Sequence, residues 1–314
     1  MQEFKAYHRG RIRQIQIYLG KFFRMFIFLN DWKVLPMAAL IAGLVSFVVG
    51  GSMFVTMEGS LMGSLALACI CLWNGCFNSI QVVCRERGIV KREHRSGMHV
   101  FSYITAHMIY QAFLCAMQSV ITILVLQLTR VALPSEGFIT PWFVLDFGIT
   151  LFLITYAADM MSLMISCIVR TTTAAMTVMP LVLIFQLVFS GVMFSLSGSA
   201  AKLTSLTISR WGIRCLCAQM NYNSLPMVAL WNQIFKFRSY EFEGVRPVEA
   251  FTNYIQEHDL IDKFCAEAGA ASTNPVYELS YENVFSCWLH LLGFVVLFAF
   301  LAMLFLKRID NDKR

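Results

Sequence analysis

The sequence predicts an all-α polytopic membrane protein with six transmembrane helices. Of its 314 residues, 58% are hydrophobic and only 14% are charged, whereas about a quarter of the residues in an ordinary soluble domain are charged. Six apolar runs each reach the roughly 20 residues that a helix needs to cross about 30 Å of hydrocarbon. These runs occupy residues 34–57, 61–84, 101–129, 142–169, 174–194 and 284–306.

The distribution of basic residues predicts that both termini lie in the cytoplasm. Lys and Arg accumulate in the short cytoplasmic loops of membrane proteins. With the N-terminus inside, the inner segments hold 17 of these residues and the outer segments hold 8. The first 33 residues spread seven of them over a long stretch, unlike the short basic tip of a cleavable signal peptide. The net charge of +6 is therefore interpreted as an orientation signal for a multi-pass cell-membrane protein, not as a nucleic-acid-binding surface.

The apolar runs divide the chain into four regions. Residues 1–33 are predicted to form a cytoplasmic N-terminus and an amphipathic connecting helix. This N-terminal helix is expected to lie in the membrane interface, since apolar residues recur in it at helical spacing. An ordinary juxtamembrane anchor would have the same periodicity. Residues 34–195 hold transmembrane helices 1–5, and residues 283–314 hold helix 6 and a cytoplasmic tail. The intervening residues 196–282 are too many for a simple connection, so we expect outer re-entrant helices and an external cap.

A short helical elbow is predicted at residues 85–97, between the second and third spans. This segment is too charged for lipid and is rich in helix-forming residues. A solvated loop that only follows the positive-inside rule is the alternative. The interleaved Glu86 and Glu93 favour specific pairing, because topology alone requires only the basic residues.

No catalytic or metal-binding motif is present in the sequence. It lacks the Gly-x-x-x-x-Gly-Lys-Ser/Thr loop that binds nucleotide phosphates. The six His residues are scattered without metal-ligand spacing, and no Ser or Cys nucleophile has a base nearby. We therefore expect a non-enzymatic chain without a cofactor, and any ATP and Mg²⁺ would bind to a separate or removed ATPase.

Two polar features of the apolar regions have alternative interpretations. Asp159 is the deeper of the two carboxylates in the predicted spans, and such a group is costly enough in lipid to be a functional candidate. Two interpretations are open: Asp159 lines a polar pathway or relays a proton, or it is neutral and hydrogen-bonded to Tyr156, Ser162 or a neighbouring helix. Asp146 is placed at the outer interface. Of the ten cysteines, Cys215, Cys217 and Cys265 are expected outside the membrane. A disulfide between Cys265 and one of the other two is one possibility, and three free thiols are the other.

Two ordered motifs resemble the transmembrane domain of ABC transporter subfamily G, the white and pleiotropic drug resistance type within the ABC-2 membrane family. The first is Asn74-Gly-Cys-Phe-Asn-Ser-Ile80 followed by Glu86-Arg87 and Arg92-Glu93. The second is Phe189-Ser-Gly-Val-Met193 followed by Ser209-Arg210-Trp211-Gly212, which is similar to the family's Phe-Ser-Gly-Leu-Leu and Pro-Arg-Tyr-Gly. The resemblance covers nearly the whole chain, but the N-terminal ATPase of that family is missing and the Pro is absent.

The resemblance implies two permease copies, or a permease and a homologue, around a central slit lined by the second and fifth helices. ABC ATPase subunits or domains would lie below, and membrane lipids would surround the dimer. Three groups of site residues follow from it. They are the substrate cavity (Asn74, Phe77, Ile184, Leu187), the outer gate (Val192, Met193) and the ATPase-coupling elbow (Glu86, Arg87, Arg92, Glu93).

The apolar lining suits an amphipathic, lipid-like or drug-like substrate, so the leading interpretation is the permease subunit of an ATP-driven ABC exporter. An ABC-2 permease for a polysaccharide or peptide is one alternative, although the aromatic and acidic tracks expected of a polymer channel are not seen. A membrane scaffold or sensor that binds an ATPase without transport is another.

Overall fold

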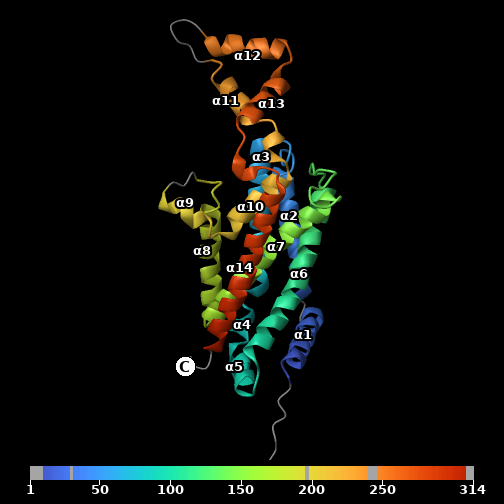
Figure 1. The fold of residues 1–314 in the computed structure, drawn as a ribbon, viewed down its shortest axis with the longest axis vertical. Helices are drawn as coiled ribbons and strands as arrows, with labels where there is room; N and C mark the ends of the chain where they lie inside the picture. The colour runs from blue at the N-terminus through green and yellow to red at the C-terminus, as the bar shows by residue number, and fades with distance from the viewer. Residues whose placement is uncertain (1–9, 29–30, 195–197, 240–245, 309–314) are drawn as a thin grey trace, which may run out of the picture.

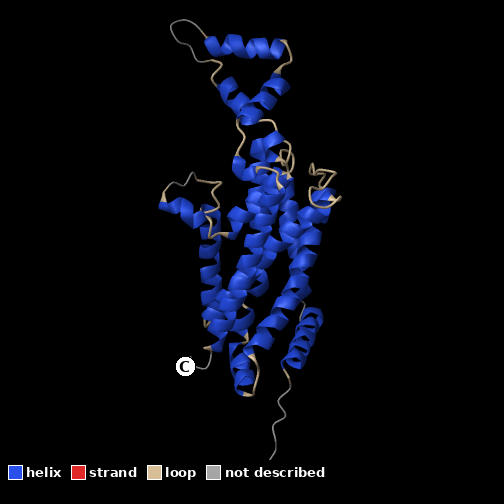
Figure 2. Ribbon diagram, in the orientation of Figure 1, coloured by secondary structure: helices blue, strands red, loops and turns tan. Residues whose placement is uncertain are grey.

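The computed structural model describes residues 10–28, 31–194, 198–239 and 246–308, which form helices and loops without a β-strand (Figure 2). Parts of the predicted regions 1–33, 196–282 and 283–314 lie outside these ranges. The molecule is elongated, with α12 (Pro247–Glu257) at one end and α5 (Arg87–Arg95) near the other (Figure 1). We call these the cap end and the elbow end.

The predicted fold class is confirmed. Five described helical segments are long and apolar enough to cross a membrane. They contain α2 (Val34–Val49), α3 (Met57–Ser79) with α4 (Val82–Arg85), α6 (Val100–Leu128), α7 (Phe143–Ile168) and α14 (Tyr281–Lys307). The remaining predicted run, at residues 174–194, contains α8 (Thr172–Val188), which is apolar but has only 17 residues. At 1.5 Å per residue it is about 25 Å long, at the lower limit for a transmembrane helix.

The first two helices have different boundaries from the predicted runs. The run at 34–57 is divided, because α2 ends at Val49 before two glycines and α3 begins at Met57. The hydroxyl oxygen of Thr56 accepts a hydrogen bond from the Gly59 amide at 3.0 Å and so caps α3. A cap of this kind contributes about 1 kcal/mol to helix stability.

Helix α7 is the centre of the bundle, and 83% of its most apolar 18-residue stretch is buried. It packs against α3, α14, α6 and α10 (Ile208–Gln219). At Gly75 of α3 the two backbones come into contact, and a Cβ there would lie 2.2 Å from the carbonyl oxygen of Thr155. Only glycine permits this approach, so Gly75 sets the spacing of α3 and α7.

The segment between α8 and α14 contains several helices. They are α9 (Ser199–Thr204), α10, α11 (Val228–Lys236), α12 and α13 (Ile261–Ala271). Of these, α9 and α10 lie beside the bundle and the other three lie at the cap end (Figure 1). Helices α11 to α13 form a triangle (Figure 1) around a small core of Trp231, Ile255 and Cys265. Cys215 and Cys217 are buried in α10, and all ten cysteines are free thiols, so the disulfide left open by the sequence is absent.

Asp146 organises the loop that precedes α7. Its side chain is 1% exposed and accepts hydrogen bonds from the backbone amides of Phe138, Ile139 and Thr140 at 2.8 to 3.2 Å. Because these amides satisfy the carboxylate, its burial has a local structural reason.

Replacing Gly75 by Ala should lower the free energy of unfolding by about 1–3 kcal/mol, because the added methyl group would force the α3 and α7 backbones apart. Reversible unfolding of the purified chain in bicelles measures the change. Gly293→Ala in α14 is the control, since a Cβ at Gly293 meets nothing within 4 Å. Equal stability of the two variants would show that the contact at Gly75 does not fix the packing.

Candidate permeation path and coupling elbow

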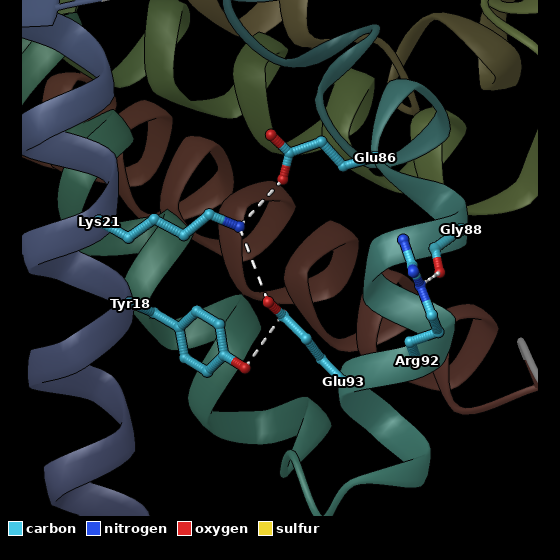
Figure 3. A network of polar contacts seen from close by, with 6 residues as sticks. All are labelled: Tyr18, Lys21, Glu86, Gly88, Arg92 and Glu93. Carbon is cyan, nitrogen blue, oxygen red and sulfur yellow. Dashed lines mark hydrogen bonds and ion pairs between the residues drawn. The ribbon is translucent and has the colours of Figure 1, made fainter.

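Lys21 of α1 (Arg11–Phe28) joins two carboxylates of the elbow, as Figure 3 shows. Its Nζ lies 3.2 Å from Oε2 of Glu86 and 3.9 Å from Oε1 of Glu93. The Tyr18 hydroxyl donates a hydrogen bond to Oε2 of Glu93 at 3.1 Å. Burial, together with the nearby Glu93 carboxylate, raises the pKa of Tyr18, which therefore remains a donor. The predicted pairing partners of Glu86 and Glu93 are thus within the chain.

Further hydrogen bonds fix α1 to the loop between α5 and α6. The Gln14 side chain donates to the Gly97 carbonyl at 3.2 Å and accepts from the His99 amide at 3.0 Å. The Ser102 hydroxyl donates to the Arg11 carbonyl at 3.0 Å. Since Gly97 and His99 lie in the loop and Ser102 lies in α6, α1 is joined both to the segment that follows the elbow and to the next helix.

The two predicted coupling arginines have different environments. Arg87 donates hydrogen bonds to the carbonyls of Cys167 and Val169, at 3.1 and 3.0 Å. These residues lie near the end of α7, so Arg87 connects the elbow to the central helix. Arg92 is exposed and, among the described residues, donates one side-chain hydrogen bond, of 3.4 Å, to the Gly88 carbonyl of its own helix. The exposed face of α5 therefore carries Ile89 and Arg92.

The predicted cavity residues fall into two groups. Phe77 of α3 is 39% exposed and Ile184 of α8 is 57% exposed, and Leu187 is half-buried. Phe77 lies beside the exposed ring of Trp73, with centroids 5.3 Å apart. Asn74 is only 5% exposed and lies within the protomer. In the single chain, the apolar candidates are therefore at the surface and the polar candidate is not.

Asn78 is a polar residue that the sequence reasoning missed. It exchanges two hydrogen bonds with the Gln118 side chain of α6, at 2.9 and 3.0 Å. With Phe77 it lines a cavity of about 240 Å³ between α1, α3 and α6. The only signal in the sequence was its position directly after Phe77.

The predicted outer gate follows a bend at the end of α8. Gly191 has φ of +80°, a left-handed conformation that glycine adopts readily. Beyond it, Val192 packs against a cluster that contains Ile213 of α10, whereas Met193 is 55% exposed. Val192 therefore lies beside α10, and Met193 lies at the surface.

Gln186 attaches α8 to α10, a role that the sequence did not reveal. Its Oε1 accepts hydrogen bonds from the amides of Ile208 and Ser209, at 2.9 and 3.3 Å. The Ser209 hydroxyl donates to the Gln186 carbonyl. These bonds satisfy the first amides of α10, which have no partner within that helix.

Asp159 is fully buried in α7. Among the described residues, neither of its carboxylate oxygens has a hydrogen-bond partner of ordinary geometry, although the Ser79 hydroxyl is near. The two partners considered from the sequence bind backbone carbonyls instead, Tyr156 that of Met108 and Ser162 those of Gly75 and Asp159. The pathway role of Asp159 stays a prediction.

Comparison with known families identifies the chain. The sequence profile described as ABC-2 type transporter matches residues 13–216, which extend from α1 into α10. The chain belongs to the ABC-2 type transporter membrane family. None of the curated proteins matches the sequence significantly. The ABC-2 domain is the permease component of an ABC transporter, contains no ATPase domain, and typically works with an ABC ATPase partner.

Replacing Lys21 by Gln should accelerate amide hydrogen exchange in α5 by about twofold to fivefold. A partly exposed ion pair contributes about 0.2–1 kcal/mol, and Lys21 holds both carboxylates of the elbow. Hydrogen exchange with mass spectrometry of the purified chain measures the rate. Arg24→Gln, an equal loss of charge at an exposed position of α1, should leave the exchange unchanged. A Lys21 variant with wild-type exchange would show that the ion pairs do not hold the elbow.

Proposed function

We propose that this ABC-2 permease moves amphipathic, lipid-like or drug-like molecules out of the cell through a slit between two copies of the chain, or between the chain and a homologue. The observation that carries the proposal is the apolar surface on α3 and α8. Trp73, Phe77 and Ile184 are 37%, 39% and 57% exposed. Trp73 and Phe77 stand out because 61% of the most apolar 18-residue stretch of their segment is buried. Aromatic and aliphatic walls with few polar groups are typical of sites for apolar ligands.

The slit would close toward the cap end at Val192 and Met193. The attachment of α8 to α10 by Gln186 supports this role, because a movement of α8 relative to its neighbours would be transmitted to the bend at Gly191. We also propose, from the two sequence motifs, that the chain is a member of ABC transporter subfamily G. Leu187 of the proposed lining is already partly accessible, whereas Asn74 is 5% exposed in the single chain.

The motor would be an ABC ATPase, with ATP and Mg²⁺ bound to that partner, at the elbow end. Both termini would lie in the cytoplasm on this side, in agreement with the distribution of Lys and Arg. The exposed face of α5, with Ile89 and Arg92, would contact the ATPase. Glu86 and Glu93 would pass its movement to α1 through Lys21, and Arg87 would pass it to α7.

Phe77→Ala should raise the ligand concentration that half-maximally stimulates ATP hydrolysis by severalfold to roughly tenfold. Aromatic pairing contributes about 0.5–1.5 kcal/mol beyond burial, and about 1.4 kcal/mol corresponds to a factor of ten. The measurement uses the permease copurified with its native ATPase and reconstituted in proteoliposomes. Phe300→Ala is the matched control, because Phe300 of α14 is a 56% exposed aromatic residue of another spanning helix.

Wild-type ligand dependence and transport in the Phe77 variant would refute the slit. Stimulation without movement of the ligand across the membrane would instead support the scaffold or sensor interpretation.

Arg92→Glu should reduce ligand-stimulated ATP hydrolysis to near its basal rate while the permease remains folded. The reversal places a negative charge on the exposed face of α5, and like charges across an interface suppress binding. Steady-state hydrolysis and copurification of the ATPase are the two readouts. Lys236→Glu, an equal reversal at an exposed residue at the cap end, serves as control. Full stimulation in the Arg92 variant would show that this face of α5 is not the contact.

A further inference from the structure

Two arginines on one face of α10 line a small pocket beside the predicted gate. Arg210 and Arg214 are four residues apart, so their side chains are neighbours on the helix surface. The pocket has a volume of about 140 Å³. It is lined by Ser190, Gly191, Arg210, Ile213, Arg214, Asn274, Val276 and Tyr277.

Neutral groups hold both guanidinium groups in place. Arg210 donates a hydrogen bond from Nη1 to the Thr204 hydroxyl at 2.5 Å. Arg214 donates from Nε to Oδ1 of Asn283 at 2.7 Å and lies over the Trp211 ring, 5.4 Å from its centroid. A guanidinium has five N–H donors, and these bonds use one donor of each. The two cations are therefore oriented without being neutralised.

No carboxylate balances this charge in the part of the chain that the structure describes. The pocket lining contains no Asp or Glu, and neither guanidinium forms an ion pair there. A second pocket, in the cap, differs in this respect. Arg238 and Arg246 line it together with Glu249, whose carboxylate lies 3.5 Å from Arg246.

We propose that Arg210 and Arg214 bind the anionic head group, phosphate or carboxylate, of the amphipathic molecule that the permease exports. This inference rests on the proposed function and narrows its substrate class. Arginine suits these oxyanions because its planar fork donates two parallel, charge-assisted hydrogen bonds. The buried Ser190 hydroxyl accepts a bond from the Val192 amide at 3.4 Å and still has its own proton to donate.

The position of the pocket agrees with a site on the exit route. Ile213 lines the pocket and also belongs to the cluster against which Val192 packs. The guanidinium of Arg210 lies close to the bend, since a Cβ at Gly191 would be 3.5 Å from its Nη1. An amphiphile whose chain lies between the apolar walls would thus meet the two cations directly beside the gate.

The test is equilibrium binding of radiolabelled dodecyl phosphate to the full chain in phosphatidylcholine nanodiscs, without ATPase or nucleotide. Neutral monolaurin, with the same chain length, and inorganic phosphate serve as competitors. Arg210→Gln combined with Arg214→Gln should weaken binding by about tenfold or more, the effect of losing charge-assisted hydrogen bonds. The double Lys variant should have an affinity between those of the wild type and the double Gln variant, because it keeps both charges but lacks the planar fork.

Arg238→Gln is the matched control. Arg238 also donates to an asparagine side chain and lies over an aromatic ring, so its loss removes a similar set of contacts far from the pocket. The control should bind dodecyl phosphate like the wild type.

Three results would overturn the inference. They are wild-type binding by the double Gln variant, equal competition by monolaurin, and inorganic phosphate competing as strongly as dodecyl phosphate. The last result would assign the pocket to a free anion. The binding assay contains no ATPase, so it tests the pocket independently of export. Binding of the probe through Arg210 and Arg214 in a chain that does not transport would refute the proposed export and leave the pocket assignment intact.

Discussion

The close contact between α3 and α7 determines how the other helices are arranged. At Gly75 the two backbones touch, and α7 is buried along almost its whole length. Helices α6, α10 and α14 pack around this pair, so its position determines theirs. An interior of this density does not deform continuously, and relative movement of the helices is therefore expected at the periphery of the bundle.

Two peripheral parts have the attachments needed for such movement. At the elbow end, α1 and α5 are held together by Lys21 and connected to α7 by Arg87. Toward the cap end, α8 is attached to α10 through Gln186. Lys21, Arg87 and Gln186 form these attachments by polar contacts, and apolar packing adds to them, because Phe22 of α1 and Met179 of α8 are buried in the same core as α7. In the proposed mechanism, the rigid centre would stay fixed while these peripheral helices carry a movement from the elbow to the slit.

The sequence predicted features that depend on local pattern. The apolar runs predicted the spanning helices, and the mixed charges of residues 85–97 predicted a helical elbow, where α5 lies. The pairing between segments could not be predicted. Lys21 and Glu86 are 65 residues apart, and no local rule chooses Lys21 over the other basic residues. Asn74 and Asn78 are both on α3. Asn78 lines the cavity and Asn74 does not because of the way α3 is oriented about its own axis, which the sequence does not reveal.

The length of α8 couples this permease to the thickness of its membrane. A helix of 17 residues spans about 25 Å, roughly 5 Å less than the hydrocarbon of a typical bilayer. Such a hydrophobic mismatch is relieved by local thinning of the bilayer or by a change in the surrounding helices, and each has a modest cost per ångström. Because Gln186 joins α8 to α10, thick, sterol-rich membranes and thin membranes would impose different strain on the bend at Gly191. Lipid composition would therefore be a physical input to the region of the proposed gate, separate from any nucleotide or ligand.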